Sequence, residues 1–170
     1  MTEVRNIKIS VTTGPISLNN VIQCLTLKNI EFKSFLNFVT FKQVFSFVVF
    51  KTSANNLNHI NVSRVKNSTD IKTVESALAE LFNVPIYKTK VDNIVSTSNI
   101  NKELNLSQIV RRKIFENITY NQEQFPGLFV KYNKGTVIIF HSGKIVIVGC
   151  KSYEDIQWVV TETCARLRTL

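Results

Sequence analysis

Apolar residues alternate with polar or small residues along positions 125–150, FPGLFVKYNKGTVIIFHSGKIVIVGC. Turn-forming residues interrupt the alternation at 133–135 and at 141–144, so the stretch predicts three short antiparallel strands joined by tight turns. Successive side chains on a strand point to opposite faces. One face of the second hairpin then holds Val137, Ile139, Ile145 and Ile147, and the other holds Ile138, Phe140, Val146 and Val148. Helices explain one apolar face, and the second must meet a further layer or a partner.

The first third of the chain changes its hydrophobic period several times. Residues 4–11 alternate strictly and predict a strand. Ser17 is suited to a helix N-cap, and the apolar residues that follow it recur at i, i+3, i+4 and i+7, which predicts a short amphipathic helix. Residues 30–50 contain seven phenylalanines and predict two strands with a turn near Lys42 and Gln43.

A polar loop separates this aromatic segment from the next two elements. Residues 59–66 predict a strand, and a longer helix is expected to begin near Ser68 and to end before Asn83. The first part of the chain therefore has the order strand, short helix, several strands, long helix.

The same order starts again at residue 87. Residues 91–97 repeat the opening strand, and Asn105 with Gln108 has the spacing of a capping box at the start of a second short helix. Phe125 and Phe140 follow Phe35 and Phe50 by 90 positions. We therefore divide the chain into two repeats, 1–86 and 87–170, and predict an α+β fold in which both repeats share one curved antiparallel sheet with the helices on one side.

Composition narrows the class of partner. The 170 residues carry a net charge of +9, which favours a polyanion such as nucleic acid. The three cysteines lack metal or redox spacing and are expected to be structural thiols in a reducing compartment. No signal peptide is visible and the apolar runs are too short to cross a bilayer, so no membrane partner is expected. His59 and His141 share no spacing with acids or cysteines, so we expect no enzyme, metal site or cofactor.

Several short motifs in the second repeat resemble those of the TATA-box-binding protein family. They are FPGL at 125–128, the IIF of 138–140, SGK at 142–144 and the Gly149-Cys150-Lys151 triplet, with Asn93-Ile94-Val95 at the start of the repeat. The resemblance covers nearly the whole chain in element order and is motif-specific from about 91 to 151. In the first repeat, a polar loop at 51–58 replaces the tight SGK turn and Arg64 stands where the family has glycine.

The resemblance implies a saddle whose concave face enters the minor groove of A·T-rich DNA and bends it, a mode known for this family. Phe125 with Phe140, and Phe35 with Phe50, would be the wedges. Asn93 and Asn6 would donate to the acceptors that A·T and T·A pairs share. The apolar floor would be Val95, Thr97, Ile138, Val146 and Val148. Lys131, Lys144 and Lys151 would reach phosphates.

The resemblance also implies partners in transcription: A·T-rich promoter DNA, proteins like transcription factors IIB and IIA, and the RNA polymerase machinery. It implies a nuclear location, or a cytoplasmic viral factory if the source is a large DNA virus. An alternative is an interaction module of the same fold that binds transcription factors with weak or no DNA binding. The polar first repeat, with Lys8, Asn61 and Ser63 where the second has Val95, Val146 and Val148, favours that alternative.

Overall fold

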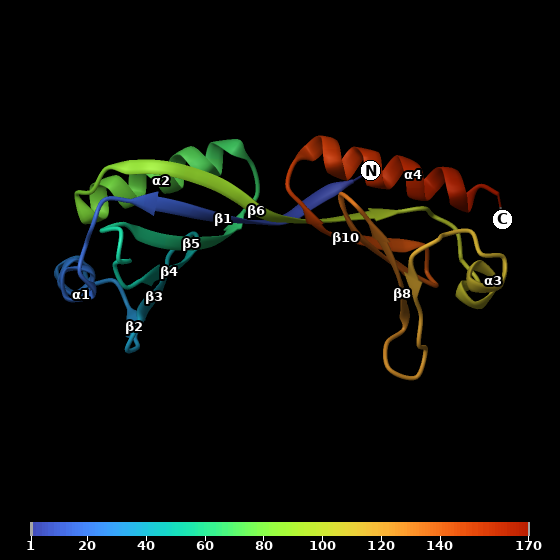
Figure 1. Cartoon of the computed structure of the whole chain (residues 1–170), viewed down its shortest axis with the longest axis horizontal. Coiled ribbons are helices and arrows are strands. Elements are labelled where there is room, and N and C mark those ends of the chain that lie inside the picture. The colour runs from blue at the N-terminus through green and yellow to red at the C-terminus, as the bar shows by residue number, and fades with distance from the viewer. Residues whose placement is uncertain (1, 170) are drawn as a thin grey trace. The chain divides into compact units, whose positions relative to one another are not determined.

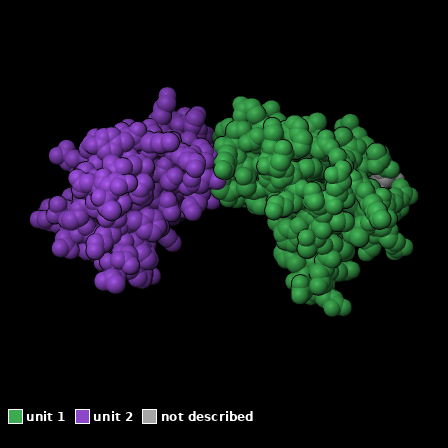
Figure 2. Space-filling view, viewed as in Figure 1, with its two compact units in different colours: residues 1–5, 93–170 green, residues 6–92 purple. Residues whose placement is uncertain are grey.

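The computed structural model describes residues 2–169, which form two compact units. Of the described residues, unit 1 contains 2–5 and 93–169, and unit 2 contains 6–92 (Figure 2). Two strands, β1 (Glu3–Thr13) and β6 (Ile86–Asn99), contribute residues to both units. The repeat boundary expected at 86 concerns the sequence and stays a prediction.

The elements of unit 2 follow the predicted order (Figure 1). After β1 come α1 (Leu18–Leu27), β2 (Phe32–Ser34), β3 (Phe38–Lys42), β4 (Ser46–Phe50), β5 (Asn58–Val65) and α2 (Ser68–Phe82). Residues 30–50 form three strands, whereas two were predicted. The additional strand, β2, is a short edge strand that pairs only with β3, and the aromatic run around it contains no glycine or proline to signal a turn.

Unit 1 repeats the order. After β6 come α3 (Leu106–Arg111), β7 (Ile118–Thr119), β8 (Gly127–Tyr132), β9 (Gly135–Phe140), β10 (Lys144–Cys150) and α4 (Tyr153–Leu167). The three strands predicted between 125 and 150 are confirmed, and β7, with two residues, was not predicted. The described strands form one open ten-stranded sheet in the order β2-β3-β4-β5-β1-β6-β10-β9-β8-β7. The α+β prediction of a sheet built from two repeats is confirmed.

Each of the four helices within the described residues begins at a polar N-cap. The side chains of Ser17, Asn67, Asn105 and Ser152 each accept a hydrogen bond from the backbone N–H three residues later. This bond satisfies one of the amides that a helix leaves free at its start. The caps predicted at Ser17 and Asn105 are therefore confirmed.

The core of each unit lies between one face of its sheet and its long helix. In unit 1 the buried strand residues lie under α4, whose Ile156 and Val159 are also buried. In unit 2 the buried residues include Val49 and Ile60 of the strands and Val74 of α2. The long helices cover only this face of the strands in each unit. The opposite face has no helical layer and is called the uncovered face below (Figure 1).

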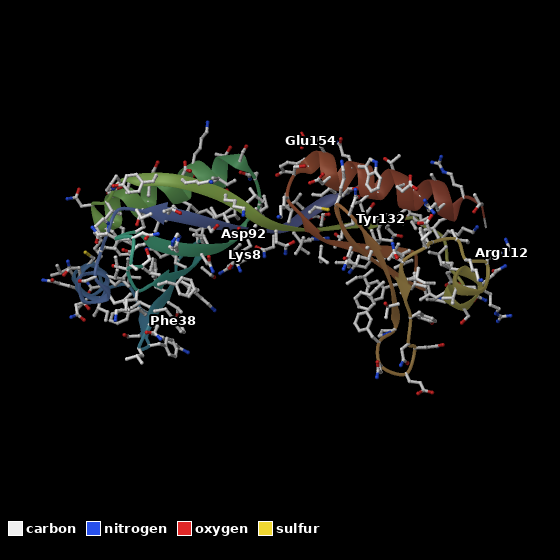
Figure 3. The ribbon with its side chains drawn as sticks, in the orientation of Figure 1. Lys8, Phe38, Asp92, Arg112, Tyr132 and Glu154 are labelled. Carbon is white, nitrogen blue, oxygen red and sulfur yellow. The ribbon has the colours of Figure 1, made fainter. Side chains whose placement is uncertain are left out.

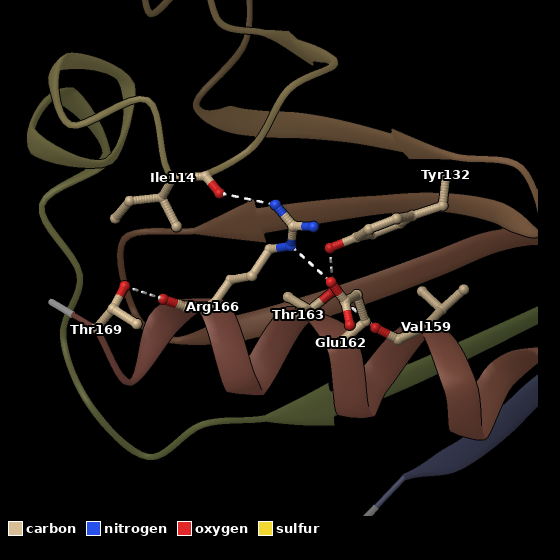
Figure 4. A network of polar contacts seen from close by, with 7 residues as sticks. All are labelled: Ile114, Tyr132, Val159, Glu162, Thr163, Arg166 and Thr169. Atoms are coloured by element: carbon tan, nitrogen blue, oxygen red, sulfur yellow. Dashed lines mark hydrogen bonds and ion pairs between the residues drawn. The ribbon is translucent and has the colours of Figure 1, made fainter.

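A polar network joins α4 to the segment that follows α3 (Figure 4). Arg166 pairs with Glu162 at 2.7 Å and donates to the carbonyl of Ile114, and Tyr132 lies 3.0 Å from the hydroxyl of Thr163. Thr163 donates its only proton to Val159, so Tyr132 must be the donor in that pair. Burial raises the pKa of Tyr132. In the unfolded chain this phenol loses its proton near pH 10, and in the folded chain it does so at a higher pH. The stability that this group contributes is therefore complete below about pH 10 and is lost as the pH rises further.

A buried asparagine anchors the polar loop that replaces the tight turn in the first repeat. Asn58 accepts from the backbone N–H of Ile16 and from the hydroxyl of Thr52, and donates to the carbonyl of Phe50. The side chain is 0% exposed. Within the loop, Ser53 donates to Leu57 through both its backbone N–H and its hydroxyl. The loop is thus tied to β4 and to the start of α1 by one satisfied polar residue.

Ser96 has a buried hydroxyl without a hydrogen-bond partner among the described residues. The equivalent position in β1 is Ile9, which is 0% exposed and apolar. We expect Ser96→Ala to raise the free energy of unfolding by about 1 kcal/mol, because it removes an unpaired buried hydroxyl. Urea denaturation of both proteins measures the change. A loss of stability would mean that the hydroxyl has a partner in solution, such as an ordered water.

Candidate nucleic-acid interface

The uncovered face of unit 1 carries a continuous row of side chains. Strand register places Thr97, Val146, Ile138 and Phe129 side by side across four strands. All four are half-buried, whereas the residues that alternate with them on β9 and β10 are 0% exposed under α4. The predicted site residues Val95 and Val148 lie on the same face. This contiguous apolar surface, open to solvent, is typical of an interaction site.

Three aromatic rings end this surface. Phe125 precedes β8 and is 38% exposed, and its ring centroid lies 5.9 Å from that of Phe140 and 5.2 Å from that of Phe129. Phe125 and Phe140 were predicted as a pair, whereas Phe129 was not. The alternation in β8 could have placed Phe129 on the apolar face. Phe129 is two residues from Gly127 and from Lys131, and side chains two residues apart on a strand point to the same face.

Gly127 makes room for this cluster. A β-carbon at this position would lie 2.6 Å from the Phe125 ring and 2.8 Å from the Cγ2 of Ile138. Both distances are shorter than van der Waals contact. Glycine therefore lets the Phe125 ring lie against β8 and β9.

The corresponding row in unit 2 is more polar. Register aligns Ser10, Asn61, Val48 and Thr40 across β1, β5, β4 and β3. Lys8 lies between the buried Ile7 and Ile9 and is exposed on this same face (Figure 3). A surface with these groups loses hydration on binding unless the partner supplies hydrogen bonds.

The aromatic cluster of unit 2 differs from the predicted pair of Phe35 and Phe50. Phe38 stands between them: its ring stacks on Phe35 at 4.5 Å and lies 6.1 Å from Phe50. Phe38 pairs with Phe50 across the strands just as Gly127 pairs with Phe140. A phenylalanine thus occupies the position that glycine leaves open in unit 1. Phe35 is 49% exposed and Leu36 is 91% exposed, so the tip of this cluster projects into solvent.

Asn93 and Asn6 are held in the same way at two β-bulges. The Oδ1 of Asn93 accepts from the backbone N–H of Gly149 at 2.6 Å, and the Oδ1 of Asn6 accepts from that of Arg64 at 2.7 Å. Both bulge residues have positive φ, 87° at Gly149 and 72° at Arg64. Because the bulge amide engages the oxygen, each asparagine presents its NH₂ group as a donor. Donors of this kind match the acceptors of A·T pairs in the minor groove.

Exposed lysines surround the unit 1 face. Lys131 lies in the cross-strand row of Val148 and Thr136, Lys144 begins β10, and Lys151 follows it. Lys42 has the place of Lys131 in unit 2, since each lies near the end of its strand, before a turn, and pairs with the next strand of the chain. The sequence predicted a turn near Lys42 and Gln43, so Lys42 was not among the predicted contacts, whereas the structure makes it the last residue of β3. None of these four lysines forms an ion pair within residues 2–169.

Two other kinds of site receive no support from the described residues. Between residues 2 and 169, no group of three His, Cys, Asp or Glu side chains is placed to hold a metal ion. No helix in that range is long and apolar enough to cross a membrane. The three cysteines are free thiols, and burial raises the pKa of Cys150.

Comparison with known proteins agrees with this geometry. The family described as "Transcription factor TFIID (or TATA-binding protein, TBP)" matches residues 88–170. The TATA-box-binding protein of Pyrobaculum calidifontis is 37% identical over 113 residues, which are 62% of this chain and 56% of that protein. The TATA-box-binding protein of Archaeoglobus fulgidus is 42% identical over 85 residues, 49% of this chain and 46% of that protein.

These matches span about half the length of the curated relatives. A solved structure described as Methanococcus jannaschii TBP covers 99% of both chains with a TM-score of 0.81 and 21% sequence identity. The fold is therefore shared over the whole chain, whereas the sequence similarity is concentrated in the second repeat.

Proposed function

We propose that this chain is a member of the TATA-box-binding protein family and acts as a transcription initiation factor that binds double-stranded DNA through the minor groove, because its second repeat matches the family model and its fold matches a TBP structure. The proposed binding partner is A·T-rich promoter DNA, which the protein bends. Wedge insertion with kinking is the mode known for this family.

The uncovered face of unit 1 is the observation that carries the proposal. Its apolar row crosses the strands side by side, and it ends in the exposed ring of Phe125 beside Phe140. Asn93 presents donors at the other end of the same face. Apolar contact, a wedge and a donor to A·T acceptors are the three contacts that minor-groove recognition uses.

Charge supports the same partner. The chain carries +9, and Lys131, Lys144 and Lys151 border the apolar face with their ammonium groups in water. Lysines in such positions neutralise phosphates and release counterions, which makes binding dependent on salt. We therefore assign these lysines to the DNA backbone and Asn93 to base edges.

We also propose that proteins like transcription factors IIB and IIA and the polymerase machinery bind the assembled complex, in the nucleus or in a viral factory. The second candidate function is an interaction module with weak DNA binding. The polar row of unit 2, with Asn61 in the place of Val146 and Lys8 in the place of Val95, favours it.

A gel mobility-shift assay with A·T-rich and G·C-rich duplexes of equal length tests the proposal. We expect binding to the A·T-rich duplex at least about tenfold tighter, because mismatched pairs each cost about 1–3 kcal/mol. A circular-permutation assay with the same protein measures bending. Equal affinity for the two duplexes, or binding without bending, would favour the interaction module.

A further inference from the structure

Asp92 extends the polar row of unit 2. Its Oδ1 accepts a hydrogen bond from the hydroxyl of Ser10 at 3.1 Å, and Ser10 is the register partner of Asn61. The carboxylate therefore lies on the uncovered face, on the side of the sheet opposite α2 (Figure 3). Asp92 is half-buried, so the face holds an anionic acceptor that is partly open to solvent.

The equivalent contact in unit 1 has the opposite charge. There the Nε of Arg5 donates to the hydroxyl of Thr97 at 3.0 Å. Arg5 directly precedes Asn6, and Asp92 directly precedes Asn93. Ser10 and Thr97 each follow the asparagine of their repeat by four residues. The row of unit 1 thus begins with an arginine, which also pairs with Glu3 at 2.8 Å, and the row of unit 2 begins with an aspartate.

This difference matters in the minor groove. A·T and T·A pairs present only acceptors there, whereas a G·C pair adds one donor, the N2 amino group of guanine. A carboxylate has acceptors only. Pressed against an A·T floor, Asp92 would lose hydration without gaining a hydrogen bond, and against guanine it would gain a charge-assisted one.

We propose that Asp92 is a specificity-determining residue that selects a G·C pair within the half-site contacted by unit 2, by accepting a hydrogen bond from the guanine N2 amino group. The inference rests on the proposed minor-groove binding. The hydroxyl of Ser10 positions the carboxylate by donating to the Oδ1 of Asp92. The Oδ2 of Asp92 is then the atom that accepts from the base. The target is therefore an A·T-rich element interrupted by one G·C pair.

Inosine provides the test, because an I·C pair keeps the pairing of G·C but lacks the N2 amino group. One duplex series carries a single G·C pair at each successive position of an A·T core, and a second series carries I·C at the same positions. At one position, and in one strand orientation, we expect the wild-type protein to bind the G·C duplex about tenfold tighter than the I·C duplex. Affinities are measured by fluorescence anisotropy at fixed salt.

Two variants separate readout from net charge. Asp92→Asn keeps the acceptor for Ser10 but puts a donor in place of the second oxygen, so the difference between G·C and I·C should fall below about twofold. Glu80→Gln, on the exposed side of α2, removes the same charge elsewhere in unit 2 and should keep the tenfold difference. Equal binding of G·C and I·C duplexes by the wild type at every position overturns the role of Asp92, as does an unchanged preference in Asp92→Asn. Absence of binding to every duplex overturns the proposed function itself.

Discussion

Replacement of both Phe125 and Phe140 with alanine is expected to abolish DNA bending and to weaken binding at least about 30-fold. Stacking of a base on an aromatic ring is worth about 1–3 kcal/mol, and the double variant loses two such contacts. Both rings lie on the uncovered face and neither is fully buried, since Phe125 is 38% exposed and Phe140 is half-buried, so the loss of stability should be smaller than for a core phenylalanine. Circular-permutation and mobility-shift assays measure the two DNA effects.

Phe47→Ala provides the matched control. Phe47 is 3% exposed and stacks on Phe41 at 4.5 Å in the core of unit 2. Its removal should cost about 3–5 kcal/mol of stability, as is usual for a buried phenylalanine. If the double variant at 125 and 140 instead lowers the melting temperature as much as Phe47→Ala does, then those rings belong to the core and are not wedges.

Asn58→Ala is expected to lower the free energy of unfolding by about 3–5 kcal/mol. The change leaves the N–H of Ile16 and the carbonyl of Phe50 without partners in a buried site, and each orphaned group costs about 1–3 kcal/mol. It also leaves a small cavity where the side chain was 0% exposed. Denaturation in urea, followed by circular dichroism, measures the loss.

The loop offers its own control. Asn55 lies three residues earlier and is exposed, so Asn55→Ala should change stability by no more than about 0.5 kcal/mol. A loss of less than about 1 kcal/mol in Asn58→Ala would mean that water replaces the missing amide. The loop would then be held mainly by Ser53 and Leu57.

Sequence periodicity identified elements best where turn residues interrupt it. The hairpins of 127–150 were predicted correctly because glycines and polar residues mark both turns and both faces alternate. The strands of segment 30–50 were not all predicted, because phenylalanines occupy core, surface and turn positions alike in this segment. Phe41 is buried and Phe35 is exposed, yet nothing in their residue type distinguishes them.

The candidate site shows a second limit. A constant offset of 90 residues pairs Phe35 with Phe125, but strand register relates Phe38 to Gly127, an offset of 89. One residue inserted before β3 therefore changes which ring lies against Phe50. The orientation of the Asn6 and Asn93 side chains could not be predicted from the sequence either. It depends on a hydrogen bond from the backbone N–H of a bulge residue that lies more than fifty residues away in the chain.

The division of β1 between the units has a consequence for synthesis on the ribosome. Unit 2 can fold once residue 92 has emerged, because all of its residues precede that point. Unit 1 needs residues 2–5 together with residues 93–169, and the Arg5 to Thr97 bond spans 92 positions. The N-terminal residues must therefore remain available while the first repeat folds, and they join their own unit only after the second repeat has been translated.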